Sequence, residues 1–172
     1  MYAGGIRALL LQALHPAAMA GVAGHSGYRS DPWGRLQRTS EFIAMTTYGP
    51  IESAEALIAK IRAVHERVRG KTDDGTPYRA SDPHLLEWVH IAETQSFLAS
   101  FQHYGDRRLS QAEADAYVAQ AAPVGEMLGA VDLPRSEAEL LAALEKYRPE
   151  LRASAAALDT VAFLLRHPPI PW

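Results

Sequence analysis

The seven histidines are the main candidates for metal chemistry in this sequence, and His65 is the most informative of them. It lies at helical spacing from a run of apolar residues, so we expect its ring to face the interior. The apolar residues of this stripe are Ala54, Leu57, Ile58, Ile61, Val64 and Val68. A neutral imidazole on a buried helix suits an iron ligand, whereas a core histidine held by one hydrogen bond is the simpler alternative. The zinc-protease pattern His-Glu-x-x-His is excluded, because Arg69 stands where the second histidine would be.

His90 and Glu93 form a second polar pair, one helical turn apart and flanked by apolar residues. Their burial costs several kcal/mol unless they bond each other, a ligand or a partner. The pair therefore either braces a helical bundle or contributes to a metal or ligand site. The two residues stand in the reverse order of the Glu-x-x-His motif of di-iron bundles, and the pair occurs only once. We therefore do not expect a di-iron enzyme.

A third group gathers Arg35, Arg38 and Thr39 on one face of a predicted helix start, with Arg29 shortly before it. Arginine side chains one turn apart suit carboxylates or other anions. The alternative is a solvated face with ordinary surface ion pairs.

The composition excludes several other classes of protein. There is no cysteine, which rules out disulfides, thiolate-bound haem, iron–sulfur clusters and a cysteine nucleophile. The net charge is -3 and no basic face is evident, so nucleic acid is not an expected partner. No apolar run reaches the roughly 18 residues that a transmembrane helix needs. We expect a cytoplasmic protein.

Glycine and proline divide the chain into about seven helices, with no convincing strand. The sequence therefore predicts a single all-α domain over residues 1–172, built as a helical bundle. We expect the segment Lys71–Ala80 to be a loop and Pro168–Trp172 to be non-helical. The predicted helices span residues 5–14, 35–48, 53–69, 82 to the connector at 105, 110–129, 136–147 and 149–166, with a short alanine-rich segment at 17–23.

Several fragments occur in a fixed order over roughly residues 4–105. They are Arg7-Ala-Leu-Leu-Leu-Gln-Ala-Leu-His15-Pro16, His25-Ser26, Asp31-Pro-Trp-Gly-Arg35-Leu36, Arg38-Thr39, Val64-His65-Glu-Arg-Val-Arg-Gly70, Tyr78-Arg-Ala-Ser-Asp-Pro83 and Leu85-Leu-Glu-Trp-Val-His90. Together they resemble the MpaB and latex-clearing-protein (rubber oxygenase) family.

This resemblance implies an all-α fold with a globin-like core, haem b as the cofactor, and cleavage of isoprenoid double bonds with dioxygen. His65 matches the family's proximal iron ligand, while Arg35, Arg38 and Thr39 match its Arg-x-x-Lys-Thr motif. Arg38 replaces the lysine, and its guanidinium stays charged. In this interpretation His90, with Glu93, orients a group near the haem. No counterpart is evident for the glutamate of rubber-cleaving members, and the chain looks shorter than the family at both ends.

Two alternatives remain open beside a haem oxygenase that takes dioxygen and a small apolar substrate. One is a non-catalytic helical domain or carrier that keeps the fold without haem. The other is a non-haem metal enzyme using His65, His90 and Glu93.

Overall fold

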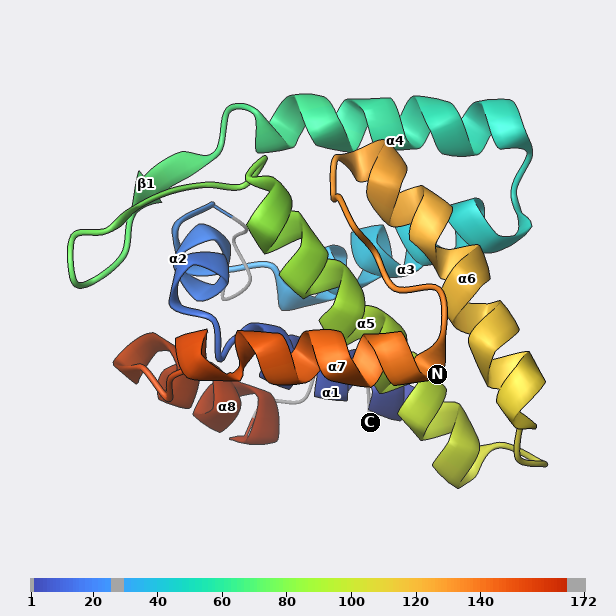
Figure 1. The fold of residues 1–172 in the computed structure, drawn as a ribbon. Helices are drawn as coiled ribbons and strands as arrows, with labels where there is room; N and C mark the ends of the chain where they lie inside the picture. Colours follow the sequence, from blue (N-terminus) through green and yellow to red (C-terminus); the bar gives the residue numbers. More distant parts are fainter. Residues whose placement is uncertain (1, 26–29, 167–172) are drawn as a thin grey trace.

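The structure is a computed structural model that describes residues 2–25 and 30–166. This part of the chain folds into eight α-helices, one 3₁₀ turn and one small hairpin, which confirms the predicted all-α class (Figure 1). The elements are α1 (Tyr2–Gln12), α2 (Pro16–His25), α3 (Pro32–Tyr48), α4 (Ile51–His65), β1 (Arg69–Lys71), β2 (Pro77–Arg79), α5 (Pro83–Tyr104), α6 (Gln111–Leu128), α7 (Glu137–Tyr147), the 3₁₀ turn Arg148–Glu150 and α8 (Ala155–Arg166). The predictions for Ser26, Arg29 and Pro168–Trp172 fall outside the described residues.

Helix α5 is the central element, running through the molecule between α1, α6 and α7 (Figure 1). It begins where the sequence predicts, because the Asp82 carboxylate accepts the His84 backbone N–H and Pro83 opens the first turn. Apolar and small residues lie almost all round it, as burial on several sides requires. The main core cluster comprises Trp88, Ile91, Ala92 and Leu98 of α5, Ala114 and Val118 of α6, and Leu140 and Tyr147 of α7.

Helix α1 packs antiparallel against α5 at unusually short range. Arg7 donates to Ser96 Oγ at 2.7 Å near one end, and Trp88 Nε1 donates to the Gln12 carbonyl at 3.4 Å near the other. Small residues permit this approach: a Cβ on Gly4 would lie 2.8 Å from a ring carbon of Phe97. The close pairing fixes the end of α1, and thereby the start of α2, against the first half of α5.

The segment after α4 differs from the prediction. Residues 69–71 and 77–79 pair as an antiparallel hairpin, so the predicted loop at 71–80 is confirmed only for residues 72–76, and the predicted helix end at Arg69 is wrong. Strands of three residues are too short to show an alternating pattern in the sequence. The hairpin is held by Tyr78, which is buried beside α2; a Cβ on Gly21 would lie 3.5 Å from its ring.

The last helix is also shorter than predicted. Residues 148–150 form a 3₁₀ turn, and α8 begins only at Ala155, where it packs on α2 through Ala157 and Thr160. Pro149 therefore opens the short turn and not the long helix.

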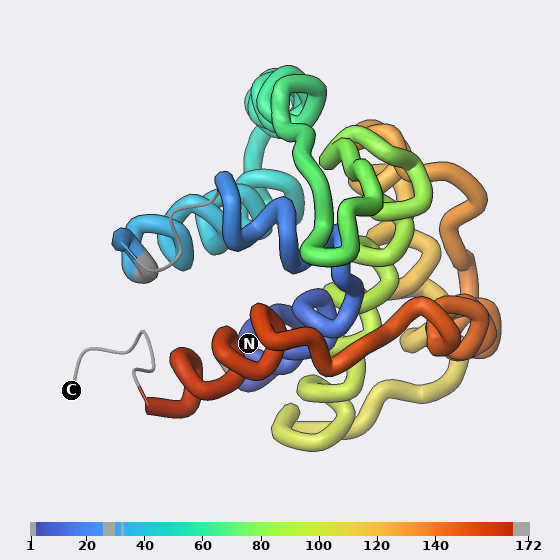
Figure 2. Tube along the Cα trace, turned by 90° about the vertical axis from the view of Figure 1, so that its left-hand side faces the viewer, coloured from blue at the N-terminus to red at the C-terminus, as the bar shows by residue number. Residues whose placement is uncertain are grey.

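Helices α3 and α4 form one side of the molecule, away from α7 (Figure 2). Their burial is much lower than that of α5. Of the side chains described in these two helices, only Ile58 is fully buried. Among the described residues no single helix is long and apolar enough to cross a bilayer, and the pair α1 and α2, which together would suffice by length and composition, is bent by 108°.

Candidate functional site

His65 is the last residue of α4, where the structure ends the helix four residues earlier than expected. Its ring is half-buried, and its Nδ1 is shielded from solvent without a hydrogen-bond partner in the described part of the chain. Burial lowers the pKa of the imidazole, so the ring is neutral near neutral pH. A neutral, partly shielded imidazole nitrogen with no partner has the properties of a metal ligand.

Several apolar side chains of α3 and α4 are only half-buried. They are Leu36, Phe42, Ile43 and Met45 of α3, and Leu57 and Ile61 of α4. Val64, beside His65, is 47% exposed, so the predicted stripe of α4 is buried only in part. These side chains keep part of their apolar surface in contact with water, which a further apolar group could cover.

The predicted polar patch on α3, formed by Arg35, Arg38 and Thr39, is partly half-buried and partly exposed. Arg35 is half-buried, whereas Arg38 and Thr39 are exposed. Arg38 Nη1 lies 3.2 Å from Asp31 Oδ2, and Asp31 is also the N-cap of α3, accepting the Gly34 N–H. The Thr39 hydroxyl donates to the Arg35 carbonyl within the same helix at 3.0 Å. Arg38 and Thr39 are therefore engaged locally, as the alternative of a solvated face anticipated.

His90 and Glu93 lie where α5 faces α6. The His90 ring is 3.4 Å from the Thr94 hydroxyl, one turn later, and α6 packs so closely that a Cβ on Gly125 would lie 2.7 Å from His90 Nδ1. Burial lowers the pKa of His90 to about 4 and raises that of Glu93 to about 7. Both side chains are thus mostly uncharged near pH 6, which reduces the cost of burying them.

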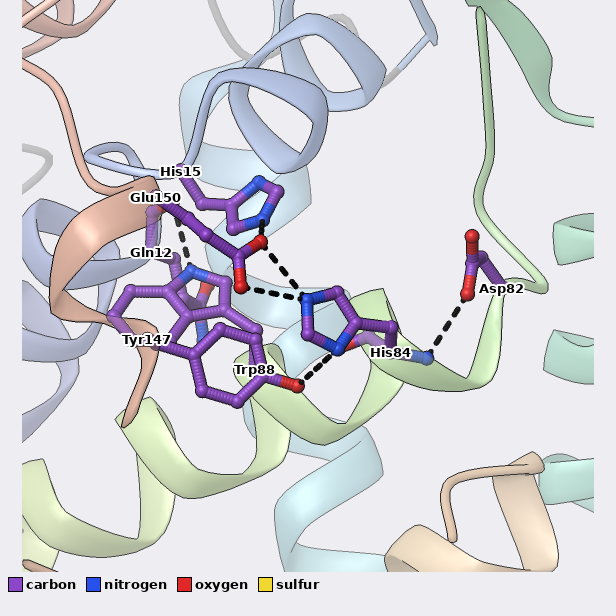
Figure 3. A network of polar contacts seen from close by, with 7 residues as sticks. All are labelled: Gln12, His15, Asp82, His84, Trp88, Tyr147 and Glu150. Carbon is purple, nitrogen blue, oxygen red and sulfur yellow. Dashed lines mark hydrogen bonds and ion pairs between the residues drawn. The ribbon is translucent and has the colours of Figure 1, made fainter. Parts of the chain in front are cut away.

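A third group, which the sequence did not single out, joins His15, His84 and Glu150 (Figure 3). His15 precedes α2, His84 lies in the first turn of α5, and Glu150 ends the 3₁₀ turn. The Glu150 Oε2 atom is 3.3 Å from His15 Nε2 and 2.9 Å from His84 Nε2. Burial would raise the pKa of Glu150, but the hydrogen bonds from the two histidines outweigh it and lower that pKa.

Aromatic rings hold these histidines in place. The His84 and Tyr147 rings stack with centroids 4.5 Å apart, and the His15 ring lies 6.1 Å from that of Trp88. Tyr147 and Trp88 are fully buried, and burial raises the pKa of Tyr147 well above its usual range, so its hydroxyl keeps its proton. The sequence held no local signal for this group, because 135 residues separate His15 from Glu150.

The structure does not bring His65, His90 and Glu93 together. Among the described residues, the group of histidine and acidic side chains whose ligand atoms lie within 4.8 Å of one another is His15, His84 and Glu150. The non-haem metal site predicted from His65, His90 and Glu93 is therefore not formed.

Comparison with known proteins places the chain in a family. A family model described as ER-bound oxygenase mpaB/B'/Rubber oxygenase, catalytic domain, matches residues 1–172. The chain belongs to this family. No curated protein and no solved structure matches the chain, so the expected globin-like core stays a prediction. Membership of the mpaB/rubber oxygenase family confirms the resemblance seen in the sequence and makes the class of the protein an oxygenase catalytic domain.

Proposed function

We propose that this member of the mpaB/rubber oxygenase family is a haem-b-dependent oxygenase that acts with dioxygen on a small apolar substrate. The observation that carries the proposal is His65: its Nδ1 is shielded and has no partner in the described part of the chain. It is the one residue of the predicted site whose environment already fits the cofactor. The half-buried apolar side chains of α3 and α4, the helix that His65 ends, support the same assignment.

His65 would hold the iron from the end of α4. Because burial lowers its pKa, the ring would remain neutral and able to act as a ligand at a lower pH than an ordinary histidine. Haem, when bound, supplies the dioxygen and redox chemistry. The contribution of the chain is ligation, orientation and the exclusion of water.

Arg35 would bind the carboxylates of the cofactor, because it combines a permanent charge with partial burial. Arg38 would act there only after leaving Asp31, and Thr39 only after leaving the Arg35 carbonyl. We assign Arg35 the larger role in holding the cofactor, because its side chain is half-buried whereas those of Arg38 and Thr39 are exposed.

His90 and Glu93, which lie between α5 and α6 and not beside His65, would brace the helical frame as an uncharged pair. The pKa of His90 is about 4 and that of Glu93 about 7, so near pH 6 the imidazole is neutral and the carboxyl largely protonated. The absence of charge lowers the cost of burying both side chains between the two helices.

Reconstitution with haemin tests the proposal. Purified protein is titrated with haemin, and the Soret band, the haem stoichiometry and, after reduction, oxygen consumption with a soluble isoprenoid are measured. We expect one haem per chain and isoprenoid-dependent oxygen consumption. His65→Ala should lose the Soret band, whereas His103→Ala, an exposed histidine of α5, should behave as the wild type.

Two results would contradict the proposal. A protein that takes up no haemin has no haem site. A Soret band that is equally strong in His65→Ala places the iron on another residue. Haem binding through His65 without any oxygen consumption would instead identify a carrier that keeps the family fold.

A further inference from the structure

The group of His15, His84 and Glu150 has the composition of a metal site and not only that of a structural brace. Two imidazoles and one carboxylate converge from three elements that are far apart in the sequence. A metal bound about 2.1 Å from each ligand holds tetrahedral ligand atoms roughly 3.4 Å apart. Glu150 Oε2 lies 3.3 Å from His15 Nε2, close to that value, and 2.9 Å from His84 Nε2, which is shorter; all three ligand atoms lie within 4.8 Å of one another.

The Tyr147 hydroxyl determines which nitrogen of His84 carries hydrogen. It lies 2.8 Å from the His84 carbonyl oxygen and 3.0 Å from His84 Nδ1. The carbonyl cannot donate, so the hydroxyl donates to it, and Nδ1–H must then donate to the hydroxyl oxygen. The buried Glu87 carboxylate, a second acceptor acting on this hydroxyl, has the same effect.

This assignment leaves a lone pair on Nε2 of a neutral His84, facing the Glu150 carboxylate at 2.9 Å. Two acceptors at that distance repel each other unless a cation lies between them. The cation is either an extra proton on His84 or a metal ion shared with Glu150. The hydrogen bond that the far nitrogen, Nδ1–H, donates to Tyr147 is also the support that a metal-binding imidazole commonly has.

Access to the group is open on one side. A groove of about 250 Å³ is bordered by His15, Glu150, Asp74 and Arg152. The side chains of His84 and Glu150 are 44% and 42% exposed, whereas that of His15 is 8% exposed. An ion could thus enter from the groove and keep a coordination position directed toward solvent.

We propose that His15, His84 and Glu150 bind one divalent transition-metal ion of the Zn²⁺ or Fe²⁺ class, at a site separate from His65. Two imidazoles with one carboxylate are a ligand set that both ions accept while keeping open positions. Tyr147 is a positioning residue, because it holds the His84 ring through Nδ1. This site does not depend on the proposed haem function.

Titration of the full chain with Zn²⁺ and Co²⁺ tests the site after metal is removed with a chelator and without added haemin. We expect one ion per chain, visible Co²⁺ bands from nitrogen ligation, and a higher melting temperature with Zn²⁺. Glu150→Gln and His84→Ala should each weaken binding at least tenfold. Tyr147→Phe, which keeps all three ligands, should weaken it about 10- to 100-fold.

Three controls fix the position of the ion. His65→Ala, His103→Ala and Glu145→Gln should bind Zn²⁺ as tightly as the wild type. The proposal is overturned if the wild type binds no ion, which would leave a protonated His84 as the cation, or if Glu150→Gln and His84→Ala bind as well as the wild type. Because His65→Ala keeps this site, failure here and failure of the haem proposal are distinguishable.

Discussion

Two regions of the molecule bury the apolar side chains of their helices to very different extents. Around α5, residues such as Trp88, Ile91 and Leu140 have no exposed surface. On α3 and α4 the large apolar side chains are half-buried or exposed, with Ile58 the exception among those described. A helix normally buries its apolar stripe, so a stripe left half open indicates a missing partner.

The difference in burial also indicates that the two regions have different roles. The α1–α5–α6–α7 core is closely packed around fully buried side chains, although Gln95 Oε1 of α5 is buried without a hydrogen-bond partner in the described part of the chain. The α3–α4 side carries His65, with an imidazole nitrogen left unpartnered in the described part of the chain. We infer that the core provides a rigid frame and that α3 and α4 reach full burial only with a cofactor.

The largest expected effect compares one leucine from each region. Leu140→Ala in the core should lower the free energy of unfolding by about 2–5 kcal/mol, since it leaves a cavity among fully buried neighbours. Leu57→Ala on α4 removes the same atoms from a half-buried site and should cost less than about half as much. Urea unfolding of the haem-free proteins measures both. Equal losses would show that α3 and α4 are packed as tightly as the core.

The next effect is the pH dependence of stability that arises from His90 and Glu93, the buried pair of α5. The folded state holds the Glu93 proton up to about pH 7, whereas the ordinary pKa is 4.5, so stability falls as the pH rises between these values. The penalty reaches up to about 3 kcal/mol. His90 acts oppositely: its pKa falls from 6.5 to about 4, so stability is lost as the pH falls through that range.

Glu93→Gln isolates the first of these effects. Between pH 5 and pH 8 the wild type should lose stability through the ionisation of Glu93 and the variant should not. The free energy of unfolding of the variant should therefore rise relative to that of the wild type, as measured by urea unfolding at both pH values. Glu145→Gln, an exposed glutamate of α7, serves as the matched control and should show no such gain. A wild type and a Glu93→Gln variant with parallel pH profiles would show that Glu93 is ionised in the folded protein.

Adjacent glycines of α1 provide a smaller test of how closely the core is packed. A Cβ on Gly4 would lie 3.2 Å from the Phe97 Cα, whereas one on Gly5 would meet nothing within 4 Å. Gly4→Ala should therefore cost about 1–3 kcal/mol, and Gly5→Ala should gain up to about 1 kcal/mol from helix propensity. Thermal unfolding distinguishes the two, and a stabilising Gly4→Ala would mean that α1 is free to move away from α5.

The core was more predictable from the sequence than the rest. The Asp82-Pro83 start of α5 and the Ser110 and Ser136 caps are local signals, and all three begin helices as expected. The hairpin at 69–79 was missed because its strands are short, and its burial depends on Tyr78 reaching α2. These are tertiary effects, which no window of the sequence contains.

The residues of the candidate site could likewise be predicted from the sequence only in part. His65 could be selected from its helical stripe, although the structure puts it at the end of α4 and not within it. Arg38 could not be placed correctly, because its pairing with Asp31 depends on where α3 begins. The association of His15 with Glu150 could not be predicted, since it needs the positions of α1, α5 and the 3₁₀ turn together.

The smallest effect compares two aspartate caps of identical chemistry. Asp82→Ala at α5 should lower the global free energy of unfolding by about 1 kcal/mol. Asp31→Ala at α3 removes the same kind of cap from a less buried helix, so it should mainly increase local opening of the first turn of α3. Urea unfolding combined with hydrogen exchange separates the global from the local loss. Equal global losses would contradict the comparison.

Hydrogen exchange with and without haemin tests the central claim most directly. In the haem-free protein we predict faster exchange of the backbone amides in α3 and α4 than in α5. Haemin should slow exchange in α3 and α4 of the wild type, leave α5 unchanged, and have no effect on His65→Ala. Protection of α3 and α4 equal to that of α5 before haemin is added, or equal protection by haemin in His65→Ala, would contradict the account.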